Sequence, residues 1–228
     1  MPRKSVIAID GPAGAGKSTI AKLLSQELGY RYVDTGAMYR ALTWKALRDR
    51  VPFHSPEALS SLAKKTKLRF VQKKGVSRML ADGEDVTGRI RTQRVTRLTN
   101  TLAAVKGVRQ VLRQRQREMG REGGVVMEGR DIGTAVFPQA DFKFYLDASP
   151  MERALRRYRE LKAKNKRVSL DSIAEAIRQR DYKDRTRGIS PLKVAPGATV
   201  IDTTKMTLHD VFKFILNHVR REGRNGND

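Results

Sequence analysis

The feature that most constrains this chain is the glycine-rich segment Gly11–Ser18, which lies between an apolar run and a helical pattern. Residues 5–10 (Ser-Val-Ile-Ala-Ile-Asp) form a short β-branched run, which predicts a buried strand. Apolar residues then recur at helical spacing from Ile20 until Gly29. A strand that passes through a tight turn directly into a helix is typical of the first unit of a parallel α/β fold.

The turn itself reads Gly-Pro-Ala-Gly-Ala-Gly-Lys-Ser, which matches the pattern G-x-x-x-x-G-K-[ST]. Glycines allow successive backbone N–H groups to line one concavity, and such a concavity binds phosphates. We expect Lys17 to contact the β- and γ-phosphates of ATP, and the Ser18 hydroxyl to ligate Mg²⁺. The alternative is a glycine-rich turn that binds nothing. The predicted ATP-binding residues are Gly11, Pro12, Ala13, Gly14, Ala15, Gly16, Lys17, Ser18 and Thr19.

The rest of the chain alternates between the two periodicities. Short apolar runs at 32–33, 125–127, 142–146 and 199–201 predict strands, and helical patterns lie between them, which together favour a parallel sheet flanked by helices. Residues 68–86 differ, because apolar residues alternate there around Gly75 and Asp82-Gly83, which predicts a small antiparallel insert. Residues 89–119 are helical in pattern, with a break expected near Gly107. Basic helices are expected at 150–164 and 169–185, and an amphipathic helix at 207–221.

Composition excludes several classes of protein. The chain has 228 residues, no cysteine and three histidines, which rules out disulfides, thiolate zinc sites and cysteine nucleophiles and leaves no usual histidine metal cluster. No apolar run approaches the roughly 18 residues of a membrane span, and no long apolar region follows the first residues. We therefore expect a cytoplasmic protein without a membrane partner.

The charge is unusual, since 47 Lys and Arg against 24 Asp and Glu give a formal net charge of +23. Nucleic acid, an anionic membrane or a small polyphosphate would each suit such a surplus. Residues 51–100 carry a surplus of 7 positive charges and residues 151–200 a surplus of 8. Because both blocks alternate with apolar residues, they are expected to be folded and not to form a nucleic-acid-binding arm.

Arginines also occur where an α/β sheet places ligands. Arg40 lies near the start of the helix after the second predicted strand, and residues 128–133 (Glu-Gly-Arg-Asp-Ile-Gly) follow a strand end. Further arginines and an aspartate recur at three- and four-residue spacing on the two basic helices: Arg153, Arg156, Arg157, Arg180, Asp184 and Arg187. A solvated charged face is the alternative interpretation. Beside a phosphate-binding loop, however, such arginines suit phosphoryl transfer between two polyanions, which requires charge neutralisation on donor and acceptor.

Five segments together resemble bacterial cytidylate kinases, a family of nucleoside monophosphate (NMP) kinases. They are the phosphate-binding loop, Asp34–Arg40, Gly88–Thr92, Glu128–Thr134 and Arg180–Arg187, and the likeness runs from about residue 5 to 220. The resemblance implies a single P-loop NMP-kinase domain with a small β insert and a helical lid. Its parts are a core (about 1–34, 105–147 and 186–228), an NMP-binding region with the insert (about 35–104), and a lid with adjoining helices (about 148–185).

The resemblance also implies site residues. Arg40 and Arg130 would hold the CMP phosphate, and Arg180 and Asp184 the sugar hydroxyls. The cytosine would be surrounded by Thr35, Asn100, Arg109, Asp131 and Arg187. Arg153 and Arg157 resemble lid arginines that close over the ATP phosphates, so that Lys17, Arg130, Arg153 and Arg157 form the implied catalytic set. Thr35 and Asn100 depart from the commonest family pattern, which has serine at both positions.

The implied activity is the ATP- and Mg²⁺-dependent phosphorylation of CMP and dCMP by a monomeric enzyme, with no specific nucleic-acid partner. One rival is a P-loop kinase for UMP, another nucleotide or a different acceptor. A second rival is a P-loop protein that binds RNA or has a regulatory role, although aromatic residues make up only 6% and no RNA-binding motif is present. Two aspartates have simpler alternatives: Asp34 as a helix cap, and Asp10 as either a turn residue or an indirect Mg²⁺ partner.

Overall fold

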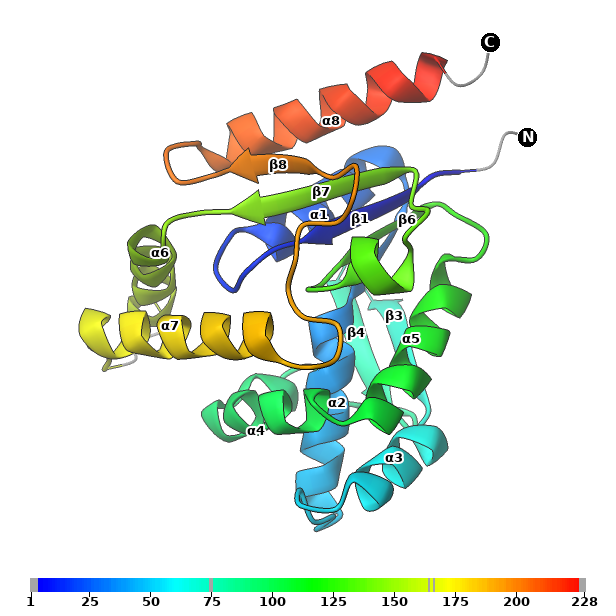
Figure 1. Cartoon of the computed structure of the whole chain (residues 1–228), viewed down its shortest axis with the longest axis vertical. Helices are drawn as coiled ribbons and strands as arrows, with labels where there is room; N and C mark the ends of the chain where they lie inside the picture. Colours follow the sequence, from blue (N-terminus) through cyan, green and yellow to red (C-terminus); the bar gives the residue numbers. More distant parts are fainter. Residues whose placement is uncertain (1–3, 74–75, 164, 166, 226–228) are drawn as a thin grey trace. The chain divides into compact units, whose positions relative to one another are not determined.

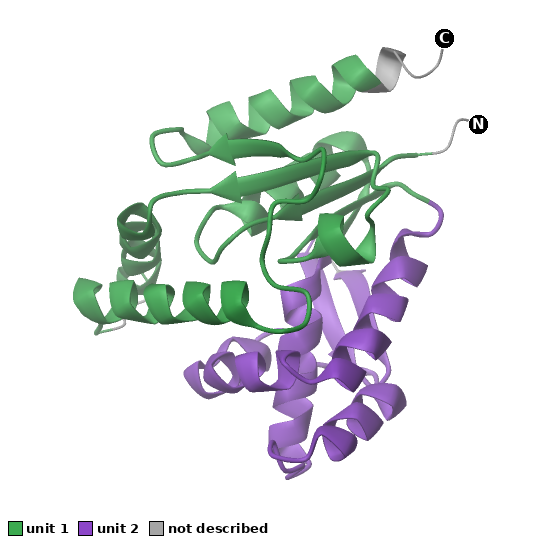
Figure 2. Cartoon of the chain, viewed as in Figure 1, with its two compact units in different colours: residues 1–32, 123–228 green, residues 33–122 purple. Residues whose placement is uncertain are grey.

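The computed structural model describes residues 4–73, 76–163, 165 and 167–225. The chain divides into two compact units, which are coloured separately in Figure 2. Unit 1 comprises residues 1–32 and 123–228, and unit 2 comprises residues 33–122. The chain passes from unit 1 to unit 2 within β2 (Arg31–Asp34) and returns to unit 1 between Glu122 and Gly123.

The main sheet has five strands in the order β2-β6-β1-β7-β8. Its central strand β1 (Val6–Asp10) pairs in parallel with β6 (Val125–Glu128) and β7 (Phe142–Asp147), and β7 pairs in parallel with β8 (Thr199–Asp202). Every residue of β1 is buried, which explains why its sequence is a continuous apolar run and does not alternate. The carboxyl ends of β1, β6 and β7 therefore lie at one edge of the sheet, where ligands bind in such folds.

Helices α1 (Lys17–Leu28) and α8 (Leu208–Asn225) pack against the sheet of unit 1. The shared core includes Ile9 of β1, Leu24 of α1, Phe144 of β7 and Ile215 of α8. Helices α6 (Pro150–Lys162) and α7 (Leu170–Thr186) form a separate pair, joined by Ala154, Ile173 and Ile177 among others, and the chain reaches them from β7 (Figure 1). A short π-helix, η2 (Ile132–Val136), follows β6.

Unit 2 has its own hydrophobic core, which includes Met38, Leu59, Leu102 and Leu112. It contains the helices α2 (Thr35–Arg48), α3 (Pro56–Lys65), α4 (Gln93–Ala103) and α5 (Lys106–Gly120), and the 3-10 helix η1 (Arg89–Arg91). The strands β3 (Leu68–Lys73), β4 (Val76–Ala81) and β5 (Glu84–Asp85) form an antiparallel sheet in that order. Side chains of Asp34, Ser55 and Thr92 cap three of the helices.

The α/β fold class and the antiparallel insert are confirmed, except that Gly75 lies outside the described residues. The expected break near Gly107 is confirmed, since α4 ends at Ala103 and α5 begins at Lys106. Gly107 lies inside α5, and there a Cβ would collide with the Ser60 side chain. This glycine therefore permits close packing of α3 on α5 and does not end a helix.

The division into core, NMP-binding region and lid remains a prediction. In the structure, α5 groups with residues 33–122, whereas the expected core included it. No helix among the described residues is long and apolar enough to cross a membrane.

Candidate functional site

The loop from Gly11 to Gly16 joins the end of β1 to the start of α1. Gly11, Gly14 and Gly16 have φ angles of 143°, 82° and 90°, which residues with a Cβ rarely adopt. A Cβ on Gly11 would also collide with the carbonyl oxygen of Leu146 on β7. The glycines therefore allow the loop to lie tightly against β7. The N–H groups of the loop lie next to the positive N-terminal end of α1, and this combination favours the binding of phosphate.

Lys17 is the first residue of α1, and only 5% of its surface is exposed. Its Nζ donates to the carbonyl oxygen of Pro12 at 2.6 Å, so the side chain folds back over the loop. Burial, together with the nearby charge of Arg130, lowers the pKa of Lys17 to about 7. The charge of Lys17 is thus aimed into the loop, and a bound polyphosphate would favour its protonated form.

The Ser18 hydroxyl donates to Oε1 of Glu128 at 2.5 Å, and the Tyr32 hydroxyl donates to the same oxygen at 3.1 Å. Glu128 ends β6 and is buried. No role was predicted for Glu128 from the sequence, although an acidic residue at the carboxyl end of the neighbouring strand was a usable signal. A hydroxyl and a carboxylate side by side are the hard oxygen donors that Mg²⁺ prefers, so these residues fit that ion.

Among the described residues, no group of three or more His, Asp or Glu side chains is arranged to hold a metal ion. In phosphoryl-transfer sites, Mg²⁺ needs only one or two protein ligands beside substrate phosphates and water.

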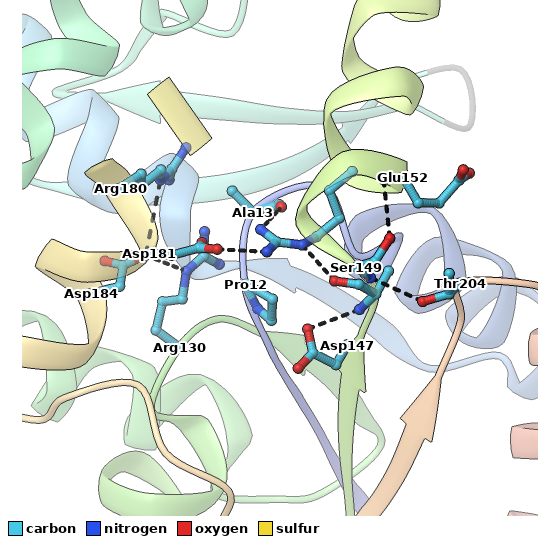
Figure 3. Close-up of polar contacts among 12 residues, drawn as sticks. Pro12, Ala13, Arg130, Asp147, Ser149, Glu152, Arg180, Asp181, Asp184 and Thr204 are labelled. Carbon is cyan, nitrogen blue, oxygen red and sulfur yellow. Dashed lines mark hydrogen bonds and ion pairs between the residues drawn. The ribbon is translucent and has the colours of Figure 1, made fainter. Parts of the chain in front are cut away.

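Asp184 on α7 forms ion pairs with three of the predicted arginines. Arg130 Nε donates to its Oδ2 at 2.9 Å, and Arg180 Nε lies 4.0 Å from Oδ2 (Figure 3). Arg187 Nη1 lies 3.5 Å from Oδ1. Burial acts to raise the pKa of Asp184, but the charges of Arg130 and Arg180 outweigh it, so that this pKa lies below its ordinary value. The structure thus brings together four residues that are separated by up to 57 positions in the sequence.

Arg153 on α6 is 1% exposed and fully engaged by neighbours. Its guanidinium donates to the carbonyl oxygens of Ala148 at 2.8 Å and Ala13 at 3.2 Å, and to Oδ2 of Asp181 at 2.6 Å. Figure 3 labels two of these partners, Ala13 and Asp181. It thereby connects α6, the phosphate-binding loop and α7. Arg157, one turn further along α6, is instead 47% exposed in its side chain and pairs with Glu160 at 2.5 Å.

Asp10 ends β1 and is 3% exposed. Its two carboxylate oxygens accept hydrogen bonds from the N–H groups of Ile132 and Gly133, at 2.9 and 2.7 Å. Burial raises the pKa of Asp10 to about 6, against the lowering effect of these two hydrogen bonds. Neither interpretation of Asp10 from the sequence included this contact, because the partners lie more than 120 residues away.

Asp131 is buried in unit 1, and unit 2 carries the predicted residues Arg40, Thr35, Asn100 and Arg109. Asp34 caps α2 by accepting from the Ala37 N–H at 2.8 Å, as proposed from the sequence, and it also accepts from Arg40 Nη2 at 2.9 Å. Thr35 is buried at the start of α2, and Asn100 is half-buried on α4. Arg109 on α5 is 2% exposed; it donates to Ala103 O at 3.1 Å, and its guanidinium lies 5.5 Å from the centre of the Tyr39 ring.

The cytidylate kinase family model matches residues 7–221. A cytidylate kinase from Geobacter sulfurreducens is 47% identical over 222 residues, which cover 97% of this chain and 95% of that protein. One from Desulforamulus reducens is 49% identical and covers 97% of this chain and 99% of that protein. The chain also matches a bifunctional pantoate ligase/cytidylate kinase from Synechococcus sp. at 50% identity, covering 92% of this chain and 39% of that protein.

Among solved structures, the crystal structure of TT1252 from Thermus thermophilus has a TM-score of 0.50 and 19% identity, covering 97% of this chain and 98% of that chain. At this identity the likeness concerns the fold alone. The family match covers nearly the whole chain, and the two cytidylate kinases align with it from end to end at close to half identity. The chain therefore belongs to the cytidylate kinase family.

Proposed function

We propose that the protein transfers the γ-phosphoryl group of ATP to CMP, giving ADP and CDP, and that it accepts dCMP in the same way. The observation that carries this function is the loop Gly11–Ser18, with three glycines at positive φ and a buried lysine, in a chain of the cytidylate kinase family. In this reaction a phosphate oxygen of CMP attacks the γ-phosphorus, and the bond between that phosphorus and the β–γ bridging oxygen breaks. The attacking oxygen is already anionic, so no general base is required.

On the donor side, the loop N–H groups and Lys17 would hold the ATP phosphates. We propose Ser18 as the Mg²⁺ ligand and Glu128 as the residue that orients the Ser18 oxygen, a role supported by their 2.5 Å hydrogen bond. Ser18 would hold Mg²⁺ there, and the ion would supply positive charge against the negative charge that develops on the transferring group. Arg153 and Arg157 are proposed to act toward the ATP phosphates, Arg153 through its contact with the loop at Ala13 and Arg157 through its exposed guanidinium.

On the acceptor side, the proposal uses the residues that the family resemblance implies. Arg130 and Arg40 are proposed to bind the CMP phosphate, and Asp184 and Arg180 the sugar hydroxyls. Asp131, Arg187, Thr35, Asn100 and Arg109 are proposed to bind the cytosine. The Asp184 cluster supports this assignment, because one carboxylate holds three guanidinium groups that would otherwise repel one another.

The test is ADP release with ATP and Mg²⁺ against a panel of CMP, dCMP, UMP, AMP, GMP and dTMP. CMP and dCMP should give the highest kcat/KM. A higher value for any other member of the panel would refute the proposed acceptor. Omission of Mg²⁺, with EDTA present, should abolish turnover.

Lys17→Ala serves as the catalytic control. Loss of its charge at the transferring group is expected to lower kcat by at least about two to three orders of magnitude, while the far-ultraviolet circular dichroism spectrum stays unchanged. A folded variant that keeps more than about a tenth of the wild-type kcat would show that Lys17 is not the catalytic lysine.

We further expect a cytoplasmic monomer without a specific nucleic-acid or membrane partner. Size-exclusion chromatography with light scattering tests the oligomeric state.

A further inference from the structure

Asp10 connects two segments that the proposed function uses for different substrates. It directly precedes Gly11, the first residue of the phosphate-binding loop. Its carboxylate accepts from the N–H groups of Ile132 and Gly133, which directly follow Arg130 and Asp131. One buried side chain thus joins the start of the ATP-binding loop to the segment that carries two of the proposed CMP-binding residues.

Backbone pairing alone does not hold this second segment. The register of β1 with β6 ends at Ile9 and Glu128, and the last ladder bond is from Gly129 N–H to Ile9 O at 3.0 Å. Beyond it the chain turns, with Asp131 at φ −148° and ψ 27°, and enters the π-helix η2 without a cap from its own side chain. The Asp10 carboxylate satisfies the first two N–H groups of η2 and so caps this helix from another strand.

We propose that Asp10 is a positioning residue for the phosphoryl acceptor: it fixes Arg130 and Asp131 relative to the phosphate-binding loop. The proposal rests on the proposed function, since it takes these two residues as acceptor contacts. In-line transfer requires the attacking and leaving oxygens to be aligned, and displacement of the acceptor by about 1 Å costs on the order of 100-fold in rate. Asp10 would thus act on the reaction through Arg130 and Asp131, without touching either substrate.

The test is Asp10→Asn. The amide keeps one acceptor oxygen but replaces the other with an NH₂ group, which faces a backbone N–H and cannot accept from it. Because a neutral amide costs less to bury than a carboxylate, the variant should fold. We expect kcat to fall about 10- to 100-fold and the KM for CMP to rise, while the KM for ATP stays within about 2-fold. Asp10→Ser, with a smaller neutral acceptor, provides a second variant and should show the same pattern.

A matched control lies at the other end of the same strand. Oδ2 of Asp141 accepts from the Val6 N–H at 2.7 Å, so Asp141→Asn also perturbs a carboxylate-to-backbone hydrogen bond on β1. It should lower Tm without changing kcat or the KM for CMP. Wild-type kcat and KM in Asp10→Asn would overturn the proposal, as would an equal kinetic loss in Asp141→Asn.

The wild-type enzyme, assayed in parallel, tests the proposed function separately. If it preferred a different acceptor, that function would fail, whereas a selective defect of Asp10→Asn in kcat and in the KM for that acceptor would still support positioning. Equal rises in the KM for ATP and for the acceptor would instead indicate a general distortion and would refute the proposal.

Discussion

Asp184 is the carboxylate that offsets the positive charges of three neighbouring arginines in unit 1. Its carboxylate is buried, and Arg130, Arg180 and Arg187 surround it at 2.9–4.0 Å. Arg130 keeps its charge despite burial, because Asp184 offsets the desolvation and raises the pKa of Arg130 above its ordinary value. Without the aspartate, three positive charges would remain together at low dielectric.

Asp184→Ala is therefore expected to lower the free energy of unfolding by about 3–5 kcal/mol, measured by urea denaturation at neutral pH. The control is Glu160→Ala, which removes a carboxylate that pairs with the exposed Arg157. This substitution should change the free energy of unfolding by less than about 1 kcal/mol. Since the pKa of Asp184 is lowered on folding, its contribution should persist at neutral pH and disappear as the pH falls below its ordinary value of 3.8. Equal losses in the two variants would contradict this account.

Asp131 is the residue at which base selection is best tested. Its side chain is buried, and a carboxylate accepts from the amino group of cytosine but repels the O4 lone pairs of uracil. Asp131→Ala should lower kcat/KM for CMP and narrow the CMP/UMP ratio by roughly 10- to 100-fold. If Asp131 only orients Arg130, both substrates lose equally, and an unchanged ratio would rule out base recognition.

At the scale of elements, close packing against β7 and α6 fixes the conformation of the phosphate-binding loop. Gly11 contacts the backbone of β7, and a Cβ on Gly14 would lie 3.0 Å from Cβ of Arg153 on α6. Arg153 then donates to the loop carbonyl of Ala13. The loop is thus held between a strand and a helix, which preorganises its N–H groups before ATP binds.

Gly11→Ala is expected to displace the loop, because the added methyl group would collide with Leu146 O and the φ of 143° would become strained. ATP affinity, measured by isothermal titration calorimetry, should fall by at least about 10-fold, and Tm should also fall. Gly88→Ala is the control, since Gly88 has a φ of −74° and a Cβ there would meet no atom within 4 Å. Wild-type ATP affinity in Gly11→Ala would refute the close-contact explanation.

The sequence predicts these elements well where the signal is local. Strand β1, the glycine loop and α1 follow from periodicity, and the Asp34 cap follows from residue type. Contacts across large sequence separations do not follow in this way. Ser18 meets Glu128, and Asp10 meets Gly133, only because parallel pairing places β6 beside β1. Arg153, which the resemblance assigned to ATP, also holds Asp181 across 28 residues, because α6 packs against α7.

For the whole molecule, the net charge of +23 is larger than the number of basic side chains assigned to the proposed nucleotide site. Many of the described arginines outside the site, such as Arg94, Arg97 and Arg159, are exposed. Charges spread in this way attract polyanions without recognising a sequence, because each contact only releases counterions.

We therefore expect weak binding to any single-stranded oligonucleotide at about 50 mM salt, which weakens by at least about 10-fold at about 200 mM salt. Fluorescence anisotropy with labelled oligonucleotides of different sequence measures it, and CMP phosphorylation should be unaffected at the higher salt. Tight, sequence-selective binding that survives the higher salt would contradict this interpretation and would favour a specific nucleic-acid partner.

The pairing of the first strand has a consequence for how the protein is made. Val6 of β1 pairs with Val125 of β6, and Ile7 pairs with Phe142 of β7, so the ribosome must add more than a hundred residues before β1 meets either neighbour. At a synthesis rate of about 5–20 residues per second, the apolar β1 remains without its neighbouring strands for on the order of ten seconds. Unit 2, with its own core around Leu42 and Leu112, is complete in sequence before β6 emerges. During synthesis the middle of the chain is thus able to fold first, and the amino-terminal strand pairs with β6 and β7 only after unit 2 has been made.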